Sequence, residues 1–290
     1  MKDFKALFSA YQFAESTEDV TATVKKIIEA GYDRHNNIEH YKKLFNSLEI
    51  TSLSPYDNED SIRRLVEKIN DLDDKFPELP SPAGICVYPF WVDTVKNLLT
   101  EDIAISTVVG FPSSQSYIEV KIAETALAVS SGATEIDMVL PVGRFLAQDY
   151  EEIHSEISEI KAAAGEAKLK VILESGLHPT PQSLYNASIL ALEAGADFIK
   201  TTTGKEKPTD LNAVYVMARA LKDFNDKTKE EHGIKLAGGI KTTQDATMYS
   251  TIIAAINGDD HINSTNLRIG ATGLANSLIT SILKEDTVYF

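Results

Sequence analysis

Three charged residues stand inside apolar segments where a β-strand is expected. Lys200 and Lys235 lie in two successive segments of this kind, and Asp137 lies in an earlier one. An ammonium group in a protein interior carries a large desolvation cost, so a lone strand lysine is more readily placed at a surface. Two inward lysines on neighbouring strands repel each other, which pushes one toward the neutral, nucleophilic amine. The pattern predicts imine chemistry on Lys200, with Lys235 as the neighbouring cation.

Asp137 is the candidate proton carrier. Segments 132–137 and 195–200 both begin with Gly-Ala and place a charged residue five positions later, so Asp137 and Lys200 take equivalent strand positions. Side chains alternate between the faces of a strand, so both enter one interior if the registers agree. Asp137 would then move protons during carbinolamine dehydration and the carbon-acid step. The alternative is a salt bridge to one of the lysines.

Glycines follow three successive strand segments late in the chain. They are Gly204, Gly238, Gly239 and Gly270, the last followed by Ala271, Thr272 and Gly273. Glycine lets backbone amides approach an oxyanion, and this quarter of a barrel commonly holds phosphate. Lys205 and Lys241 would add positive charge. One glycine pair would indicate only a turn, but three strand ends that agree predict a phosphate site.

Metal and thiol chemistry are not predicted. The histidines lack paired-ligand spacing and are interpreted as surface or loop residues, namely His35, His40, His154, His178, His232 and His261. Cys86 is the single cysteine, which leaves no disulfide or thiolate cluster. We interpret it as a small buried residue that also lines the pocket. We expect no metal and no organic cofactor.

These residues require a scaffold in which strands and helices alternate. Short apolar runs lie at 50–53, 84–89, 105–112, 135–141, 170–175, 198–204, 234–240 and 268–273. Helical patterns lie between them, at 117–131, 150–164, 181–194, 210–224 and 243–256. Strict alternation predicts a parallel sheet, and eight units match an α/β fold, the (β/α)8 TIM barrel. A doubly wound sheet is the alternative, but no Gly-x-Gly-x-x-Gly follows the first strand.

The first part of the chain reads differently. Helical spacing of apolar residues, as at Val20, Val24 and Ile27, predicts an N-terminal helical extension over 1–47 before a barrel catalytic domain over 48–290.

A net charge of -15 disfavours attraction to nucleic acid or an anionic membrane. No apolar run approaches the length of a membrane span. The lone cysteine and a start without a secretory apolar stretch predict the cytoplasm.

Several of these segments together resemble deoxyribose-phosphate aldolase. The resemblance runs from about residue 48 to residue 283. It rests on GADFIKTTTGK (195–205), EIDMV (135–139), KLAGGIKT (235–242) and RIGA (268–271), with further matches at 85–89, 109–112 and 169–174. The family consists of class I aldolases on a (β/α)8 barrel. They reversibly cleave 2-deoxy-D-ribose 5-phosphate to D-glyceraldehyde 3-phosphate and acetaldehyde.

The resemblance implies roles for residues of this chain. It makes Lys200 the Schiff-base lysine, Lys235 the neighbour that lowers its pKa, and Asp137 the proton shuttle. It also implies contacts to the substrate or its phosphate from Thr51, Thr203, Gly204, Lys205, Gly238, Gly239, Gly270 and Thr272. These assignments follow from matching motifs.

The chain departs from the family's usual pattern at four places. Glu49 stands where an aspartate is usual, which would alter how a substrate hydroxyl is held. Leu236 replaces a proline after the second lysine, and residues 90–91 replace a basic residue after Tyr-Pro. Residues 272–273 replace a pair of serines, a change that would weaken phosphate hydrogen bonding or shift tolerance toward unphosphorylated aldehydes.

Two other functions stay open on the residues alone. A metal-free sugar-phosphate isomerase would use the glycine-lined site without an amine nucleophile, and a noncatalytic phosphosugar-binding barrel would release no acetaldehyde.

We expect small phosphorylated sugars and aldehydes as partners, and we expect neither nucleic acid nor a membrane. A homodimer or homotetramer is the assembly considered. The tail at 289–290 is a candidate to fold over the site.

Overall fold

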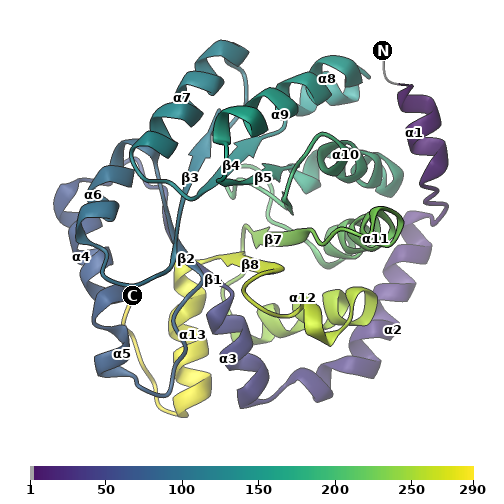
Figure 1. Cartoon of the computed structure of the whole chain (residues 1–290). Coiled ribbons are helices and arrows are strands. Elements are labelled where there is room, and N and C mark those ends of the chain that lie inside the picture. The colour runs from purple at the N-terminus through teal and green to yellow at the C-terminus, as the bar shows by residue number, and fades with distance from the viewer. Residues whose placement is uncertain (1–2) are drawn as a thin grey trace.

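Eight parallel strands close into a barrel in the computed structural model, which describes residues 3–290 (Figure 1). Each strand pairs with the next along the chain, and the first pairs with the last. The strands are β1 (Leu48–Ser52), β2 (Gly84–Val87), β3 (Ala104–Val109), β4 (Glu135–Val139), β5 (Lys168–Ile172), β6 (Phe198–Lys200), β7 (Gly233–Ala237) and β8 (Leu267–Gly270). Closure excludes the doubly wound sheet and confirms the predicted (β/α)8 fold.

Every predicted strand overlaps an observed one, but the observed strands end earlier. We predicted a strand over 198–204, whereas β6 ends at Lys200. Similarly, β3 ends at Val109, before Gly110 with its φ of +62°. The polar and glycine residues that follow the apolar runs therefore belong to loops at the C-terminal mouth of the barrel, where barrel enzymes place their sites.

Helices surround the barrel (Figure 1). The larger ones are α4 (Glu59–Asn70), α6 (Val92–Leu98), α7 (Ile118–Ser130), α9 (Tyr150–Ala164), α10 (Pro181–Glu193), α11 (Leu211–Thr228), α12 (Thr243–Asn257) and α13 (Thr272–Leu283). Shorter pieces are α5 (Leu72–Lys75), α8 (Val142–Leu146), η1 (Pro89–Trp91), η2 (Ser175–Leu177) and η3 (Asp259–His261). Gly132 and Gly195 follow the ends of α7 and α10, each with positive φ. None of the helices within residues 3–290 is long and apolar enough to cross a membrane.

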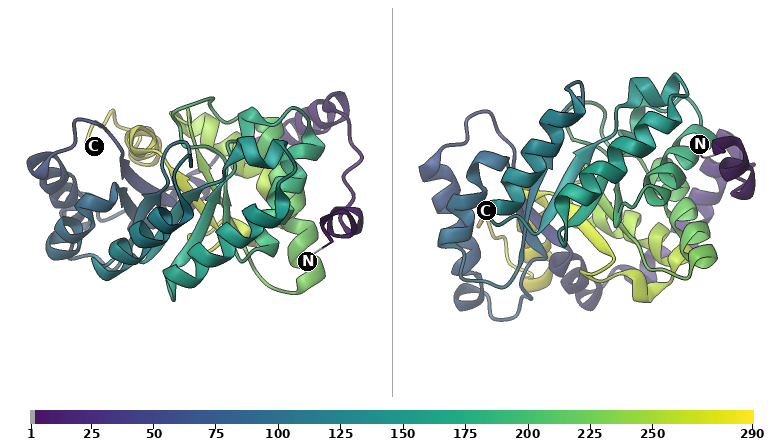
Figure 2. Two further views of the ribbon diagram at one scale, coloured as in Figure 1. Left: turned by 90° about the horizontal axis from the view of Figure 1, so that it is seen from above. Right: turned by 45° about the horizontal axis from the view of Figure 1, so that its top comes forward.

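Three helices lie before the first strand in the described part of the chain. They are α1 (Phe4–Ala10), α2 (Thr17–His35) and α3 (Ile38–Asn46). α2 begins at a capping box formed by Ser16 and Asp19, packs against α11 and α12, and leads into α3, which packs against α12 and α13. Figure 2 shows α1 at the side of the molecule opposite the C-terminal residues. A boundary between two units at residue 47 stays a prediction.

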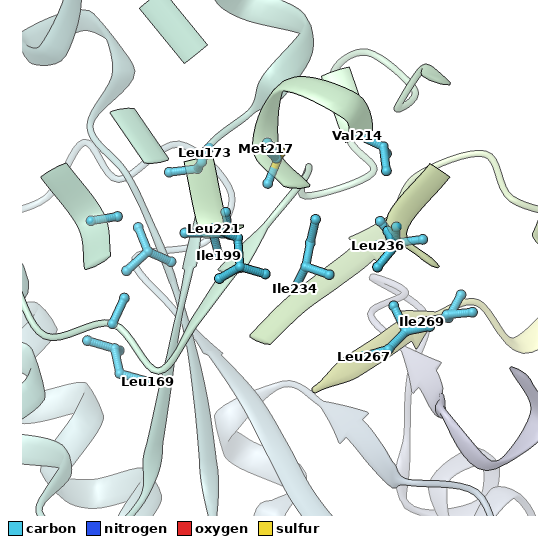
Figure 3. Close-up of a cluster of buried hydrophobic side chains, with 14 of the residues drawn as sticks. Leu169, Leu173, Ile199, Val214, Met217, Leu221, Ile234, Leu236, Leu267 and Ile269 are labelled. Carbon is cyan, nitrogen blue, oxygen red and sulfur yellow. The ribbon is translucent and has the colours of Figure 1, made fainter. Parts of the chain in front are cut away.

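The apolar core lies between the strands and the helices. Ile199, Ile234 and Leu236 are fully buried and belong to the cluster that joins β6–β8 to α11 (Figure 3). Because side chains alternate along a strand, the neighbours of these residues, Lys200 and Lys235, enter the barrel interior instead. Leu236 therefore packs in the core between the strands and the helices. A leucine in place of the family's usual proline leaves the barrel interior unchanged. Burial of such side chains, about 1.5–3 kcal/mol each, helps to offset the charges inside.

Candidate active site

Lys200 and Lys235 lie side by side inside the barrel. They are register partners on β6 and β7, and both are almost fully buried. Both line a cavity of about 550 Å³ at the mouth of the barrel. The two lysines predicted from strand position thus meet at one accessible space, which a substrate could enter.

Asp137 lies between the two lysines. Its Oδ2 atom accepts hydrogen bonds from Lys200 Nζ at 2.8 Å and from Lys235 Nζ at 2.7 Å. The side chain is fully buried on β4. The expectation that Asp137 and Lys200 face the same interior is confirmed. Asp137 also makes the salt bridges that we considered as its alternative role, so geometry alone does not separate the two.

The sequence interpretation missed four other polar residues of this centre. Asp137 Oδ1 accepts hydrogen bonds from Lys170 Nζ at 2.8 Å and from Ser106 Oγ at 3.2 Å. Lys170 also lies 2.7 Å from Glu135, and Glu135 lies 3.0 Å from Arg268. Each of the three charged residues stands in a strand, so the signal that identified Lys200 applied to them equally. Ser106 gave no such signal.

Glu49, noted as a departure from the family pattern, completes the charged centre from β1. Its Oε2 atom accepts a hydrogen bond from Lys235, and Oε1 lies 3.3 Å from Lys170 and 3.5 Å from Arg268. The charged centre, as the term is used below, is the set Glu49, Glu135, Asp137, Lys170, Lys200, Lys235 and Arg268. All seven residues are buried.

The charged centre holds four basic groups and three acidic ones. If every group were ionised, one positive charge would be left without a partner in a water-poor interior, which is unfavourable. A neutral Lys200 removes that imbalance. Within residues 3–290 the ion-pair partner of Lys200 is Asp137, which it shares with two other lysines. Charge balance therefore favours the neutral amine on Lys200.

The pKa shifts in the charged centre agree with this assignment. Burial, followed by the charge of Lys235, lowers the pKa of Lys200 although Asp137 opposes the change. Burial would also lower the pKa of Lys235, but the carboxylates of Asp137 and Glu49 outweigh it and raise that pKa. The three lysines hold the pKa of Asp137 well below its usual range despite burial, which acts the other way. The directions of these shifts favour the neutral amine on Lys200, the ammonium on Lys235 and the carboxylate on Asp137.

The predicted phosphate glycines meet at the mouth of the barrel. Gly204, Gly238 and Gly239 have φ angles of +74°, +91° and +85°, and all three line the cavity together with Gly270. A Cβ atom on Gly238 would lie 2.4 Å from Thr202 Oγ1. That hydroxyl accepts a hydrogen bond from the Gly204 amide at 2.9 Å. Glycine at position 238 therefore lets two loops approach closely, and both expose backbone at the cavity.

Two predicted contact residues have their polar groups engaged elsewhere. Lys205 Nζ donates to the carbonyl oxygen of Leu53 at 2.8 Å and so links the loops after β6 and β1. The hydroxyl of Thr272 donates to the carbonyl oxygen of Thr51 at 2.7 Å and accepts from the Thr51 amide at 2.8 Å. Thr51 and Lys241 line the cavity. Substrate contacts from Lys205 and Thr272 stay predictions, because each would have to give up these partners.

Glu174 is a further residue that the sequence interpretation did not single out. It follows β5 with a φ of +52°, which is uncommon for a residue other than glycine. Its carboxylate accepts a hydrogen bond from the amide of Thr203, a residue that lines the cavity. A strained backbone of this kind persists where its surroundings fix it. Glu174 therefore positions the loop after β6.

Cys86 on β2 is not among the residues that line the cavity, although we predicted a place there. It is fully buried, and burial raises the pKa of its thiol. Among the described residues, Cys86, Glu49 and Asp137 form a group whose potential metal ligand atoms lie within 4.8 Å of one another. Both carboxylates are already paired with lysine cations, so a metal ion would have to displace an ammonium group. The donor set does not favour a metal, and its absence stays a prediction.

Our interpretation of the histidines was wrong for three of the six. His35, His40 and His261 are buried, because α2, α3 and η3 pack onto α12. His35 Nδ1 lies 3.0 Å from Thr251 Oγ1, and His40 Nε2 lies 2.7 Å from Ser250 Oγ. Burial lowers the pKa of His40 to about 3. His35 and His40 thus join the N-terminal helices α2 and α3 to α12 of the barrel.

The tail does not cover the site. Tyr289 OH donates to the carbonyl oxygen of Lys68 at 2.7 Å, and its ring packs against Phe76 with centroids 5.1 Å apart. The amides of residues 289 and 290 both donate to Asn276 Oδ1 on α13. The tail thus returns along α13 toward α4 and α5, so its side chains are held at the flank of the barrel.

The fold and the site together define a (β/α)8-barrel enzyme whose polar centre is built on strand lysines. Residues 55–275 match the DeoC/LacD family of aldolases, and the chain belongs to that family. It is 36% identical over 259 residues to human deoxyribose-phosphate aldolase, covering 83% of this chain and 80% of the human one. The mouse deoxyribose-phosphate aldolase is 35% identical with the same coverage.

Solved structures agree with the family assignment. The tetrameric deoxyribose phosphate aldolase from Aeropyrum pernix superposes with a TM-score of 0.68 at 26% sequence identity. The superposition covers 88% of this chain and 97% of the other. The chain is therefore an aldolase, a lyase, on the fold that the strand pattern predicted.

Proposed function

We propose that this aldolase reversibly cleaves 2-deoxy-D-ribose 5-phosphate to D-glyceraldehyde 3-phosphate and acetaldehyde through an imine on Lys200. The observation that carries the proposal is the uneven charged centre, four basic groups against three acidic ones, with the lowered pKa on Lys200 at the cavity. A buried neutral amine beside a fixed ammonium is the state that attacks an aldehyde carbon.

The charged centre can supply each proton that the reaction moves. Lys200 Nζ adds to C1 of the open-chain sugar, and loss of water gives the protonated imine. Removal of the C3 hydroxyl proton breaks the C2–C3 bond, releases glyceraldehyde 3-phosphate and leaves an enamine on Lys200. The enamine takes a proton at C2, and hydrolysis releases acetaldehyde. Asp137 accepts hydrogen bonds from both lysines. Its carboxylate can therefore take up a proton once a neighbouring ammonium group has lost one.

The glycine loops would hold the other end of the substrate. Gly204, Gly238 and Gly239 expose backbone at the cavity, and Lys241 adds positive charge there. Lys200 and these loops line the same cavity, which suits a five-carbon chain whose phosphate and aldehyde lie at opposite ends. Binding of the phosphate would fix C1 near the amine and so contribute through orientation.

Reductive trapping and acetaldehyde release test the proposal together. With 2-deoxyribose 5-phosphate and borohydride, the wild type should form a covalent adduct on Lys200, located by peptide mass spectrometry. Lys200→Leu should lose the adduct and, as for other removed nucleophiles, roughly 10⁴-fold or more of the activity. Activity kept in Lys200→Leu would favour a sugar-phosphate isomerase. Substrate binding without acetaldehyde release or proton exchange in the wild type would favour a binding protein.

We also propose a homodimer or homotetramer that works in the cytoplasm. Phe90, Tyr117, Val120 and Leu127 are large apolar side chains exposed on or next to α7 and η1. Large apolar side chains that gather at one part of a surface often mark a protein contact. The tetrameric relative supports a second copy as the cover. Light scattering should give a smaller mass for Leu127→Glu than for the wild type.

A further inference from the structure

Asp137 by itself does not decide which of the two lysines is the nucleophile. Its Oδ2 atom lies 2.8 Å from Lys200 Nζ and 2.7 Å from Lys235 Nζ, so it stabilises either ammonium to the same extent. Both lysines line the cavity and both are buried. A proton shared by this pair therefore needs a second group to place it on one side.

Glu49 supplies the asymmetry. Its Oε2 atom accepts a hydrogen bond from Lys235, whereas within the described chain its ion pairs are with Lys235, Lys170 and Arg268 and not with Lys200. The carboxylate is fully buried on β1 and is held ionised, since the cations around it lower its pKa to about 2 although burial opposes them. The Glu49 carboxylate is therefore a fixed negative charge beside Lys235, and Lys235 is one lysine of the pair.

We propose that Glu49 is the positioning residue that keeps the shared proton on Lys235 and thereby makes Lys200 the nucleophile. The inference deepens the proposed imine chemistry and rests on it. Glu49 is one methylene longer than the aspartate usual in the family. That length lets one oxygen reach Lys235 on β7 while the other stays near Lys170 and Arg268.

Loss of the Glu49 charge should redirect the chemistry. Without it, the ammonium form of Lys235 keeps one carboxylate partner, the same number as Lys200, so the neutral amine is divided between them. The pKa of Lys235 falls when an adjacent carboxylate is removed, typically by about one unit or more. Lys235 should then attack aldehydes at a lower pH than it does in the wild type.

Trapping with acetaldehyde and cyanoborohydride measures this directly. The lysine nitrogen adds to the carbonyl, water leaves, and hydride reduces the imine to an ethylamine that peptide mass spectrometry locates. In the wild type the adduct should lie on Lys200 up to about pH 9, below the ordinary lysine range. Glu49→Gln should divide the adduct between Lys200 and Lys235, with Lys235 labelled from a pH about one unit lower or more.

Two variants separate positioning from structural damage. Glu135→Gln removes a buried carboxylate that contacts Lys170 and Arg268, so its adduct should stay on Lys200 even if it unfolds more easily. Glu49→Asp keeps the charge and should label mainly Lys200, with a smaller shift for Lys235. It serves as the test variant if Glu49→Gln does not fold.

The outcomes distinguish the two proposals. An unchanged adduct site and pH profile in Glu49→Gln, or in Glu49→Asp if that is the variant that folds, would overturn the role of Glu49 and leave imine chemistry intact. Equal redistribution in Glu135→Gln would also overturn it, because any loss of buried charge would then suffice. A wild type that forms no adduct on Lys200 would instead remove the proposed function itself.

Discussion

The two parts of the candidate site are built in opposite ways. The charged centre consists of side chains on rigid strands, all buried and each paired with at least one other. The other part, the glycine loops proposed to bind the phosphate and called the phosphate end below, consists mainly of backbone beyond the strands, where Gly204 and Lys241 are exposed. A change in the charged centre should therefore lower stability, and it should also alter the chemistry where it changes the charge on Lys200 or Lys235. A change at the phosphate end should disturb binding of the phosphate and little else.

Of the variants that test this comparison, Lys170→Met should have the largest effect on stability and chemistry. Lys170 lies between three carboxylates and is fully buried, so its loss should lower the free energy of unfolding by about 3–5 kcal/mol. The remaining acids are then balanced only when Lys200 is protonated. Its pKa should rise, and imine trapping should require a higher pH. Urea unfolding and the pH dependence of trapping measure the two effects.

A surface lysine gives the matched control for that variant. Lys222 pairs with Asp226 one helical turn away on α11, and such pairs contribute less than about 1 kcal/mol. Lys222→Met should leave both unfolding and trapping as in the wild type. If Lys170→Met also behaves in that way, the buried charges do not act as one connected centre.

The two parts of the site also differed in how far the sequence predicted them. A strand lysine is unusual enough to be noticed, so Lys200, Lys235 and Asp137 were identified from residue type and position. Lys170 and Arg268 carried the same signal, but their role depends on barrel closure, which brings β5 and β8 to the same interior. The fold followed from the alternation of apolar runs, which reflects burial.

The course of the loops could not be predicted from the sequence. Thr272 is bound to the backbone of Thr51 because β1 and β8 are neighbours in the closed barrel. Lys205 reaches the carbonyl oxygen of Leu53 from the loop after β6, which is not a neighbour of β1. Residue type alone shows a lysine or a hydroxyl near a glycine but not which partner it meets. The same holds for His40, whose burial depends on where α3 packs.

Gly238→Ala should give the second largest effect and confine it to the phosphate end. The alanine Cβ would meet Thr202 Oγ1 at 2.4 Å, at a φ of +91° that disfavours any side chain. Strain of this kind is on the order of 1–3 kcal/mol. Compared with the wild type, kcat/KM for 2-deoxyribose 5-phosphate should fall roughly 10- to 100-fold, the rate equivalent of that strain. The fall should be much smaller for unphosphorylated deoxyribose.

Gly143 provides the control for a glycine at the mouth. A Cβ there meets nothing within 4 Å, and Gly143→Ala should leave both substrates unaffected. An equal loss for the two substrates in Gly238→Ala would mean that the loop after β7 supports the charged centre as well. The separation of the two parts of the site would then be wrong.

Lys241→Ala should give the smallest effect and sharpen the comparison. Lys241 is exposed at the rim of the cavity, so its attraction for a phosphate acts through water and is screened by salt. We expect KM for the phosphorylated substrate to rise about three- to tenfold at low ionic strength and to approach the wild-type value in salt, with kcat unchanged. Lys25→Ala on α2 is the control, since Lys25 pairs with Glu29 on the N-terminal helices. A fall in kcat that salt does not alter would place Lys241 with the charged centre, because only groups that touch the reacting carbons change the chemical step in this way.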